Sequence, residues 1–249
     1  MRSTNSTSAG LTLVGVGPGD PSLLTLAAVK AIESATVIAY PISAKDADSM
    51  AAEIVSTWIN HKKRRLPLVF PMVHEVNIRK KAWRTASNQI ANEVINGQRV
   101  VFLCEGDVSL FATGSYLLID LKKHFPSCPI RLIPGVTAMS AAAAIGSWPL
   151  AIHQDQLLIL PTPNNEEKLE VLIDTAAISN QVLVLLKLGH RWVWVKSLLE
   201  RKKLIKDALF AERVGWPDQQ VLPAIEVPND KNNYFSMLLL RQSWPDSIS

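Results

Sequence analysis

The sequence predicts an α/β protein with two α/β domains, the first built on an open, parallel-rich sheet and the second on a mixed sheet. Short, nearly continuous apolar runs alternate with helical segments up to about residue 144, a pattern typical of a parallel sheet covered on both faces. The second half contains five strand-like runs but only two clear helical segments. With 249 residues, 48% of them hydrophobic, the chain can bury two cores.

Five apolar runs are the strands expected in the first half: LTLVGV (11–16), TVIAY (36–40), LPLVF (66–70), RVVFLC (99–104) and PIRLIP (129–134). Between them we expect helices over residues 22–35, 46–59 and 76–97. Asp20 followed by Pro21 is a typical start for the first helix. Gly97 is a typical end for the third.

The strands expected in the second half are QLLILP (156–161), QVLVLLKL (181–188), DALFAERV (207–214), QVLPAI (220–225) and YFSMLLLRQ (234–242). Helices are expected over 166–175 and 192–201. We therefore expect a disordered tail over residues 1–10, an N-terminal α/β domain over 11–138 and a C-terminal α/β domain with a mixed sheet over 139–249.

Composition and charge restrict the possible partners. Two cysteines, Cys104 and Cys128, are too few for a disulfide framework or a cysteine metal site, and we expect no protein-bound metal. No run approaches the roughly 18 apolar residues of a membrane helix, so we expect a cytoplasmic protein with no membrane partner. The segment from Asn60 to Arg84 has eight Lys/Arg against one acid, Glu75. This basic segment either binds an anionic partner or is an ordinary solvated surface.

The stretch VGVGPGD after the first expected strand raises the question of a phosphate-binding loop. Gly15 and Gly17 fit the start of a dinucleotide fingerprint, but the third glycine comes one residue early. Asp20 would repel a phosphate at the helix start, and Pro18 and Pro21 remove two backbone donors. The stretch therefore does not predict a phosphate site.

Ligands of open parallel sheets bind beyond the carboxyl ends of the strands. At these strand exits the sequence has VGVGPGD, YPISAK, CEGDVSLFATG and PGVTAMS. The third of these loops contains Glu105 and Asp107, which favour a neutral or cationic ligand over an anion. S-adenosylmethionine, which has a sulfonium and an amino acid but no phosphate, is such a ligand.

The sequence resembles the tetrapyrrole (corrin/porphyrin) methyltransferases, which use S-adenosylmethionine, over about residues 11–242. The resemblance rests on the order and spacing of VGVGPGDPSLLTLAAVKAI, FLCEGDVSLFATGSYLL, LIPGVTAMSAAAA and ERVGWPDQQV. YPISAK, LPLVFPM, CEGD, LLKLG and YFSMLLL make it most similar to the branch that methylates C20 of precorrin-2 to precorrin-3A in cobalamin (vitamin B12) biosynthesis. One departure is GDVSLFATG, where many relatives have GDP followed by YG. The resemblance implies the tetrapyrrole methylase fold and a homodimer.

The resemblance also implies which residues bind S-adenosylmethionine, largely through backbone groups. From the first half these are Pro18, Glu105, Gly106, Asp107, Leu110, Thr137 and Ala138. From the second half they are Leu186, Lys187, Val214, Ser236 and Met237. Asp107 is the candidate for contacting the methionine or ribose part of the cofactor.

The implied substrate is an anionic tetrapyrrole, precorrin-2, whose carboxylates would give the basic segment a purpose. The residues expected to bind it are Gly17, Lys45, His74, Arg79, Lys80 and Arg84. The attacking meso carbon is already electron-rich, so the protein mainly has to align the reactants and exclude water. A proton must leave afterwards, and the candidates to assist are Tyr40, His74, Glu105 and His153.

Other interpretations stay open at this point. A cobalt-containing form of the same substrate, or another tetrapyrrole such as uroporphyrinogen III, would fit the same family. An RNA methylase is disfavoured because the basic segment has no stacking aromatic beyond Trp83. A non-catalytic nucleotide-binding module is disfavoured by the acidic residues at the expected crevice. We therefore expect no nucleic-acid partner.

Overall fold

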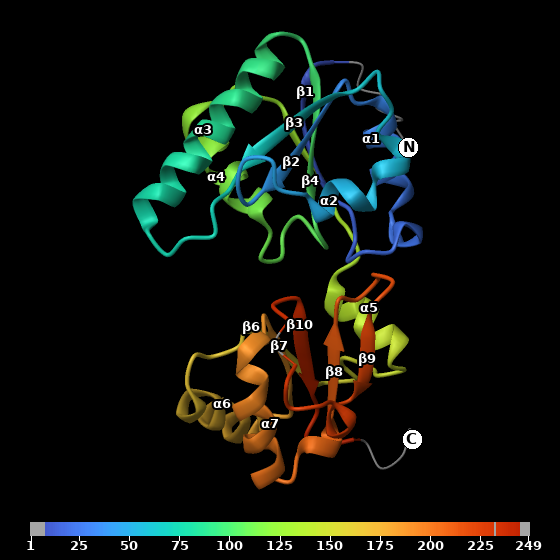
Figure 1. Ribbon diagram of the computed structural model, residues 1–249, viewed down its shortest axis with the longest axis vertical. Coiled ribbons are helices and arrows are strands. Elements are labelled where there is room, and N and C mark those ends of the chain that lie inside the picture. The colour runs from blue at the N-terminus through green and yellow to red at the C-terminus, as the bar shows by residue number, and fades with distance from the viewer. Residues whose placement is uncertain (1–7, 232, 245–249) are drawn as a thin grey trace. The chain divides into compact units, whose positions relative to one another are not determined.

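The computed structural model describes residues 8–231 and 233–244, and the chain divides into two compact units, residues 1–137 and 138–249 (Figure 1). Each unit contains its own five-stranded sheet. The predicted fold class, a parallel sheet followed by a mixed sheet, is confirmed. Most of the predicted disordered tail, residues 1–10, lies outside the described residues, but Gly10 already belongs to the first strand.

The first sheet is parallel throughout, with its strands in the order β3-β2-β4-β1-β5. Its strands are β1 (Gly10–Gly15), β2 (Val37–Ile42), β3 (Arg64–Val69), β4 (Arg99–Cys104) and β5 (Ile130–Ile133). Its helices are α1 (Leu26–Ser34), α2 (Met50–Ile54), α3 (Val76–Ile95) and α4 (Thr113–His124). Because all five strands point the same way, the loops that follow them share one edge of the sheet, which we call the carboxyl edge. The opposite one is the amino edge.

Helices α3 and α4 cover one face of this sheet, and α1 and α2 cover the other (Figure 1). The core on the first face includes Leu11 and Phe102 from the strands and Ile90 and Leu117 from the helices, all at most 1% exposed. Each such side chain contributes about 1.5–3 kcal/mol by leaving water. This apolar face holds the strands in register and so fixes the positions of their exits.

Two of the predicted helices begin elsewhere. Asp20 accepts a hydrogen bond from the Ser22 N–H at 2.7 Å and caps only a 3₁₀ turn. Leu24 is extended, and Thr25 then caps α1 by accepting from the Ala28 N–H at 3.1 Å. The helix predicted over 46–59 is reduced to α2 and a 3₁₀ turn over 56–58.

Helix α4 was not predicted from the sequence. It starts after Ala112, which offers no side-chain cap, so the usual start signal is missing. Gly114, at the second position of the helix, has a low helix propensity and so also disfavours the prediction of a helix. A Cβ on Gly114 would lie 2.5 Å from the Cys104 sulfur. Close packing of α4 on β4 thus explains this glycine.

The second sheet has the order β6-β7-β10-β8-β9, in which β6 and β7 are parallel and the other pairs are antiparallel. Its strands are β6 (Gln156–Pro161), β7 (Gln181–Leu186), β8 (Ala208–Glu212), β9 (Gln220–Pro223) and β10 (Ser236–Leu240). Its helices are α5 (Ala138–Ile145), α6 (Glu166–Ile178) and α7 (Trp192–Arg201). All five strands and both helices expected here are present.

In the described part of the chain, no helix combines the length and apolar character that crossing a membrane requires.

Candidate functional site

Two of the strand exits at the carboxyl edge of the first sheet are joined by their backbones. The Gly106 N–H donates to the Gly17 carbonyl at 2.7 Å, and the Gly17 N–H donates back to the Gly106 carbonyl at 3.2 Å. Both residues have positive φ, 79° at Gly17 and 63° at Gly106, a conformation that glycine adopts without strain. The loop after β1 is therefore fixed to the loop after β4.

A third exit, the loop after β5, packs directly against these two. A Cβ on Gly135 would lie 2.2 Å from the Gly106 carbonyl oxygen, and a Cβ on Gly15 would lie 2.6 Å from the Gly135 nitrogen. Real Cβ atoms do not approach this closely. Gly15 and Gly17 of VGVGPGD thus allow three backbones to meet, which accounts for these two glycines without a phosphate. We call this assembly of the β1, β4 and β5 exits the glycine-loop site.

Asp107 ties the β4 exit to the β5 exit. Its Oδ2 accepts a hydrogen bond from the Gly135 N–H at 2.9 Å. Its Oδ1 accepts from the Ser109 N–H at 2.8 Å and from the Ser109 hydroxyl. Desolvation works to raise the pKa of Asp107, but the hydrogen bonds from Ser109 and Gly135 outweigh it, and the pKa is lowered. Asp107 is therefore ionised at neutral pH and already engaged within the protein.

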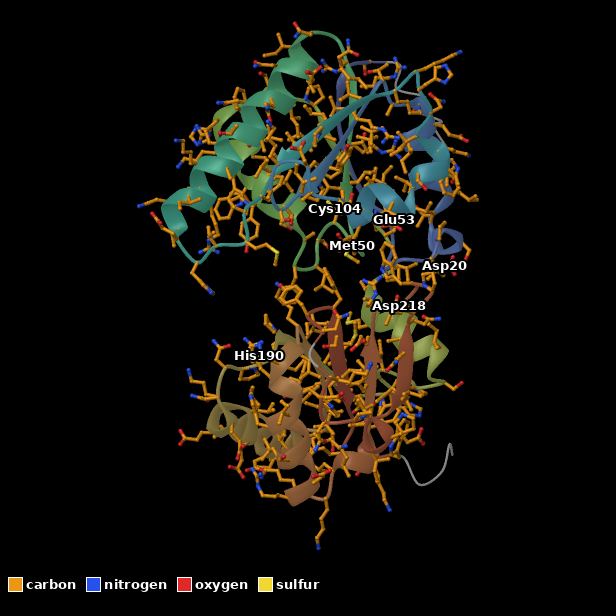
Figure 2. The ribbon with its side chains drawn as sticks, in the orientation of Figure 1. Asp20, Met50, Glu53, Cys104, His190 and Asp218 are labelled. Atoms are coloured by element: carbon orange, nitrogen blue, oxygen red, sulfur yellow. The ribbon has the colours of Figure 1, made fainter. Side chains whose placement is uncertain are left out.

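Glu105, directly before Gly106 in the loop after β4, is a different kind of carboxylate. Its side chain is exposed, yet desolvation by the surrounding protein raises its pKa. Cys104, one residue earlier, is buried, which raises the pKa of its thiol to about 12 and keeps it protonated. Figure 2 shows Cys104, and Met50 and Glu53 of α2, toward the same end of this unit.

The topology brings further predicted residues to the carboxyl edge. Tyr40 lies in the second half of β2, and Lys45 follows that strand. His74 lies between β3 and α3, and its carbonyl accepts a 3.5 Å hydrogen bond from Arg79 in the first turn of α3. Lys80 follows in the same helix and is exposed. These five residues share an edge with the glycine-loop site.

The basic segment is not a single surface, because β3 lies inside it. Residues 60–63 precede β3 at the amino edge, whereas residues 71–84 follow it. Lys63 donates to the Ile32 carbonyl at 2.8 Å, where α1 ends. Arg84 makes two 2.9 Å hydrogen bonds to Asp120 of α4. The expected anion-binding segment is thus divided, and some of its charges have structural partners.

In the second unit, the residues predicted to bind the cofactor gather at one edge of the sheet. Leu186, at the end of β7, pairs with Met237, near the start of β10. The Ser236 hydroxyl accepts a hydrogen bond from the Gly189 N–H at 3.0 Å. Val214 follows the end of β8, which pairs with the start of β10. Figure 2 shows His190, which follows β7, and Asp218, which follows β8, toward this edge.

Lys187, a predicted cofactor contact, and His153, a predicted catalytic candidate, lie at opposite edges of the second sheet. Lys187 directly follows β7 with a positive φ of 56°, and its ammonium lies 6.0 Å from the centroid of the Tyr234 ring. His153 precedes the first residue of β6, at the other edge of the sheet. Within this unit His153 is therefore separated from the residues predicted to hold the cofactor.

Gly135 and Ser109, two of the hydrogen-bond partners of Asp107, were not predicted from the sequence. A signal for Gly135 was present, because a glycine directly after a strand often marks close approach of two backbones. For Ser109 the spacing from Asp107 is typical of an aspartate that accepts from the residue two positions on. Among the described residues, no group of three or more His, Cys, Asp or Glu side chains could hold a metal.

We expect Asp107→Asn to lower the free energy of unfolding by about 1–3 kcal/mol, because an amide cannot accept the bonds from both Ser109 and Gly135. The ionised carboxylate has a lowered pKa, so its stabilisation is present above the unfolded pKa of about 3.9 and is lost as the pH falls through the folded pKa. Urea denaturation at about pH 7 and about pH 3 should show the wild type and the variant converging in acid. Asp48→Asn, at an exposed residue, is the control. A difference that is equal at both pH values would contradict the assignment.

The chain is similar to known proteins in both sequence and structure. The family model for tetrapyrrole (corrin/porphyrin) methylases matches residues 10–226. The chain is 29% identical to the cobalt-precorrin-2 C(20)-methyltransferase of Salmonella typhimurium, over 93% of this chain and 95% of that protein. It is 30% identical to the precorrin-2 C(20)-methyltransferase of Sinorhizobium sp, over 94% and 95%. The structure of uroporphyrin-III C-methyl transferase from Thermus thermophilus complexed with S-adenyl homocysteine superposes with a TM-score of 0.63 at 22% identity, over 94% and 97%.

Proposed function

Because the chain belongs to the tetrapyrrole (corrin/porphyrin) methylases, we propose that it transfers a methyl group from S-adenosylmethionine to C20 of precorrin-2, or of its cobalt form, in cobalamin biosynthesis. The predicted enzyme class, a methyltransferase of this family, is confirmed by the family match. One observation carries the choice of C20: two relatives named for this position match over nearly their whole length. One of these relatives is named for cobalt-precorrin-2 and the other for precorrin-2, so the proposal includes both forms of the substrate.

The residues of the glycine-loop site fit this methyl donor. Bare backbone at Gly17 and Gly106 leaves room for a bulky ligand, and the carboxylates of Glu105 and Asp107 favour a cationic group over a phosphate. When bound, S-adenosylmethionine supplies an electrophilic methyl group on a sulfonium. The proposed cofactor contacts in the first unit are Pro18, Glu105, Gly106, Asp107, Leu110 and Thr137. In the second unit they are Ala138, Leu186, Lys187, Val214, Ser236 and Met237.

The geometry refines the role of Asp107. Its two oxygens already accept three hydrogen bonds from Ser109 and Gly135, and a carboxylate has about four acceptor positions. We therefore propose that Asp107 acts chiefly by holding the β4 and β5 exits in place for the cofactor. Its negative charge still favours the sulfonium electrostatically.

Glu105 is our choice among the four catalytic candidates. It is part of the β4 exit, it is exposed, and its pKa is raised, which makes its carboxylate a better proton acceptor than an ordinary glutamate. In the proposed reaction a bond forms between the methyl carbon and C20, the bond from methyl to sulfur breaks, and Glu105 accepts the proton that C20 releases. Orientation of the reactants and exclusion of water supply the rest of the rate enhancement.

Substrate binding is proposed for five residues of the carboxyl edge: Gly17, Lys45, His74, Arg79 and Lys80. Their side chains, apart from the bare backbone of Gly17, offer positive charge or hydrogen-bond donors to carboxylates. Arg84 keeps only a supporting role in this proposal, because its guanidinium is paired with Asp120. The homodimer that the resemblance implies stays a prediction.

The test is to locate the transferred methyl group. Purified protein is incubated with ¹³C-methyl S-adenosylmethionine and precorrin-2, with and without cobalt, and the product is analysed by NMR. We expect the label at C20, and the faster of the two substrates identifies the natural form. Uroporphyrinogen III serves as the control substrate and should remain unlabelled. Methylation of uroporphyrinogen III instead, or a failure to bind S-adenosylhomocysteine in calorimetry, would overturn the proposal.

A further inference from the structure

A depression of about 1110 Å³ lies at the amino edge of the first sheet, and the proposed reaction gives it no role. Residues of α1, of β1, β4 and β5, and of the loop before β3 line it. It includes the starts of the strands, such as Gly10 and Arg99, whereas the glycine-loop site is built from residues that follow their ends. We call it the amino-edge depression.

The amino-edge depression concentrates the positive charge of the protein. Its charged lining residues are Lys30, Glu33, Lys62, Lys63, Arg99 and Arg131. Five cations and one anion give a formal charge of +4, which equals the net charge of the whole chain. The rest of the chain is therefore formally neutral. Positive charge gathered in a hollow raises the local concentration of anions.

Two of these cations have a structural role, and the other three are available. Lys63 donates to the Ile32 carbonyl at 2.8 Å, and the Nε of Arg99 donates to the Ser34 carbonyl at 2.8 Å. These bonds offset the negative end of α1, which would otherwise repel an anion. Lys30, Lys62 and Arg131 are exposed. Within the described residues they form no ion pair, and each comes from a different element.

We propose that the amino-edge depression is a second binding site, for a small polycarboxylate with charges spread around its rim. The available cations lie on α1, before β3 and on β5, so they suit a ligand with separated charges better than one compact phosphate. None of the described residues lining it is aromatic, so a nucleobase would find no stacking partner. The depression is large enough for a macrocycle. The choice of an anionic tetrapyrrole as this ligand rests on the proposed function.

The experiment uses uroporphyrin I, a fluorescent octacarboxylate, titrated into the full chain. The test variant is Lys62→Gln with Arg131→Gln, and the matched control is Lys122→Gln with Lys123→Gln, two exposed lysines of α4 outside the depression. We expect the test variant to bind uroporphyrin I about tenfold more weakly at low salt, and the control to bind like the wild type. Carbodiimide coupling followed by peptide mapping should place the porphyrin on Lys30 or Lys62.

Each other outcome decides against the proposal. Equal affinities of the two double variants, combined with labelling only outside the depression, would show that this surface is merely solvated. Equally tight binding of the uncharged porphyrin ester would show that charge is not recognised. Better competition by tripolyphosphate or by polyglutamate would assign the depression to phosphates or to an acidic protein. Binding of S-adenosylhomocysteine to the wild type is measured in parallel, and its loss would overturn the proposed function without deciding on this site.

Discussion

Replacing Gly135 with alanine is expected to destabilise the protein by about 3 kcal/mol and to weaken S-adenosylhomocysteine binding at least tenfold. The new Cβ would lie 2.2 Å from the Gly106 carbonyl oxygen and 2.8 Å from the Gly15 carbonyl carbon. Both neighbours are backbone atoms, one in the loop after β4 and one at the end of β1, so neither can rotate away. The β5 exit must move, and the hydrogen bond from the Gly135 N–H to Asp107 is then lost.

Gly97→Ala is the matched control for this prediction. Gly97 follows the end of α3 with a φ of 80°, and no neighbouring atom lies within 4 Å of a Cβ built there. Its replacement should therefore cost about 1 kcal/mol through backbone strain alone and leave cofactor binding unchanged. Calorimetric titration and urea denaturation of both variants measure the two effects. Wild-type affinity in Gly135→Ala would mean that the glycine-loop site does not hold the cofactor.

Much of the fold could be predicted from the sequence because its strands are apolar and the central ones are buried. The buried strand β4 is an uninterrupted apolar run that RVVFLC matches residue for residue, and the apolar run QLLILP matches the partly buried β6 in the same way. The errors occur where local signals and tertiary packing disagree. Helix α4 has no side-chain cap and contains Gly114. A glycine is needed at this position because the helix packs closely against Cys104. A pattern along the chain does not contain that contact.

The candidate site was partly predictable for a related reason. In a parallel sheet every strand exit lies at the same edge, so the loops containing Gly17 and Gly106 could be expected to meet. The partners of individual side chains could not be predicted, because they depend on exact distances between elements. Asp107 reaches Gly135, 28 residues away, and Arg84 reaches Asp120, 36 residues away. Those contacts give Asp107 a role in tying two loops together that was not predicted, and its contact with the cofactor stays a prediction.

An ion pair between a buried arginine and a partly exposed aspartate in the second unit gives the other large expected effect. Arg241, directly after β10, is 2% exposed, and its Nη1 lies 2.7 Å from Oδ2 of Asp155, just before β6. Its Nη2 also donates to the carbonyls of Pro149 and Leu150, each at 3.3 Å. The guanidinium therefore joins the chain before β6 to the end of β10, and Asp155 is the carboxylate that neutralises it.

Asp155→Asn keeps the shape of the side chain but leaves the Arg241 charge buried without a counterion, which should cost about 3–5 kcal/mol. The double variant Asp155→Leu, Arg241→Met removes both charges and should be clearly more stable than Asp155→Asn, because apolar replacement of a whole buried pair is often nearly neutral. Urea denaturation of the three proteins at neutral pH measures this order. If the double variant were the least stable, the hydrogen bonds from Arg241 to the Pro149 and Leu150 carbonyls would contribute more to stability than its ion pair with Asp155.

The same pair predicts a specific acid sensitivity. Desolvation works to raise the pKa of Asp155, but hydrogen bonds from the Ile152 N–H and from Arg241 outweigh it, and the pKa is lowered. A lowered folded-state pKa means that the stabilisation is complete above the unfolded pKa of about 3.9 and disappears as the pH falls through the folded value. Wild type should therefore lose stability below about pH 4 more steeply than Asp155→Asn. Parallel acid profiles for the two proteins would mean that Asp155 does not neutralise the buried guanidinium.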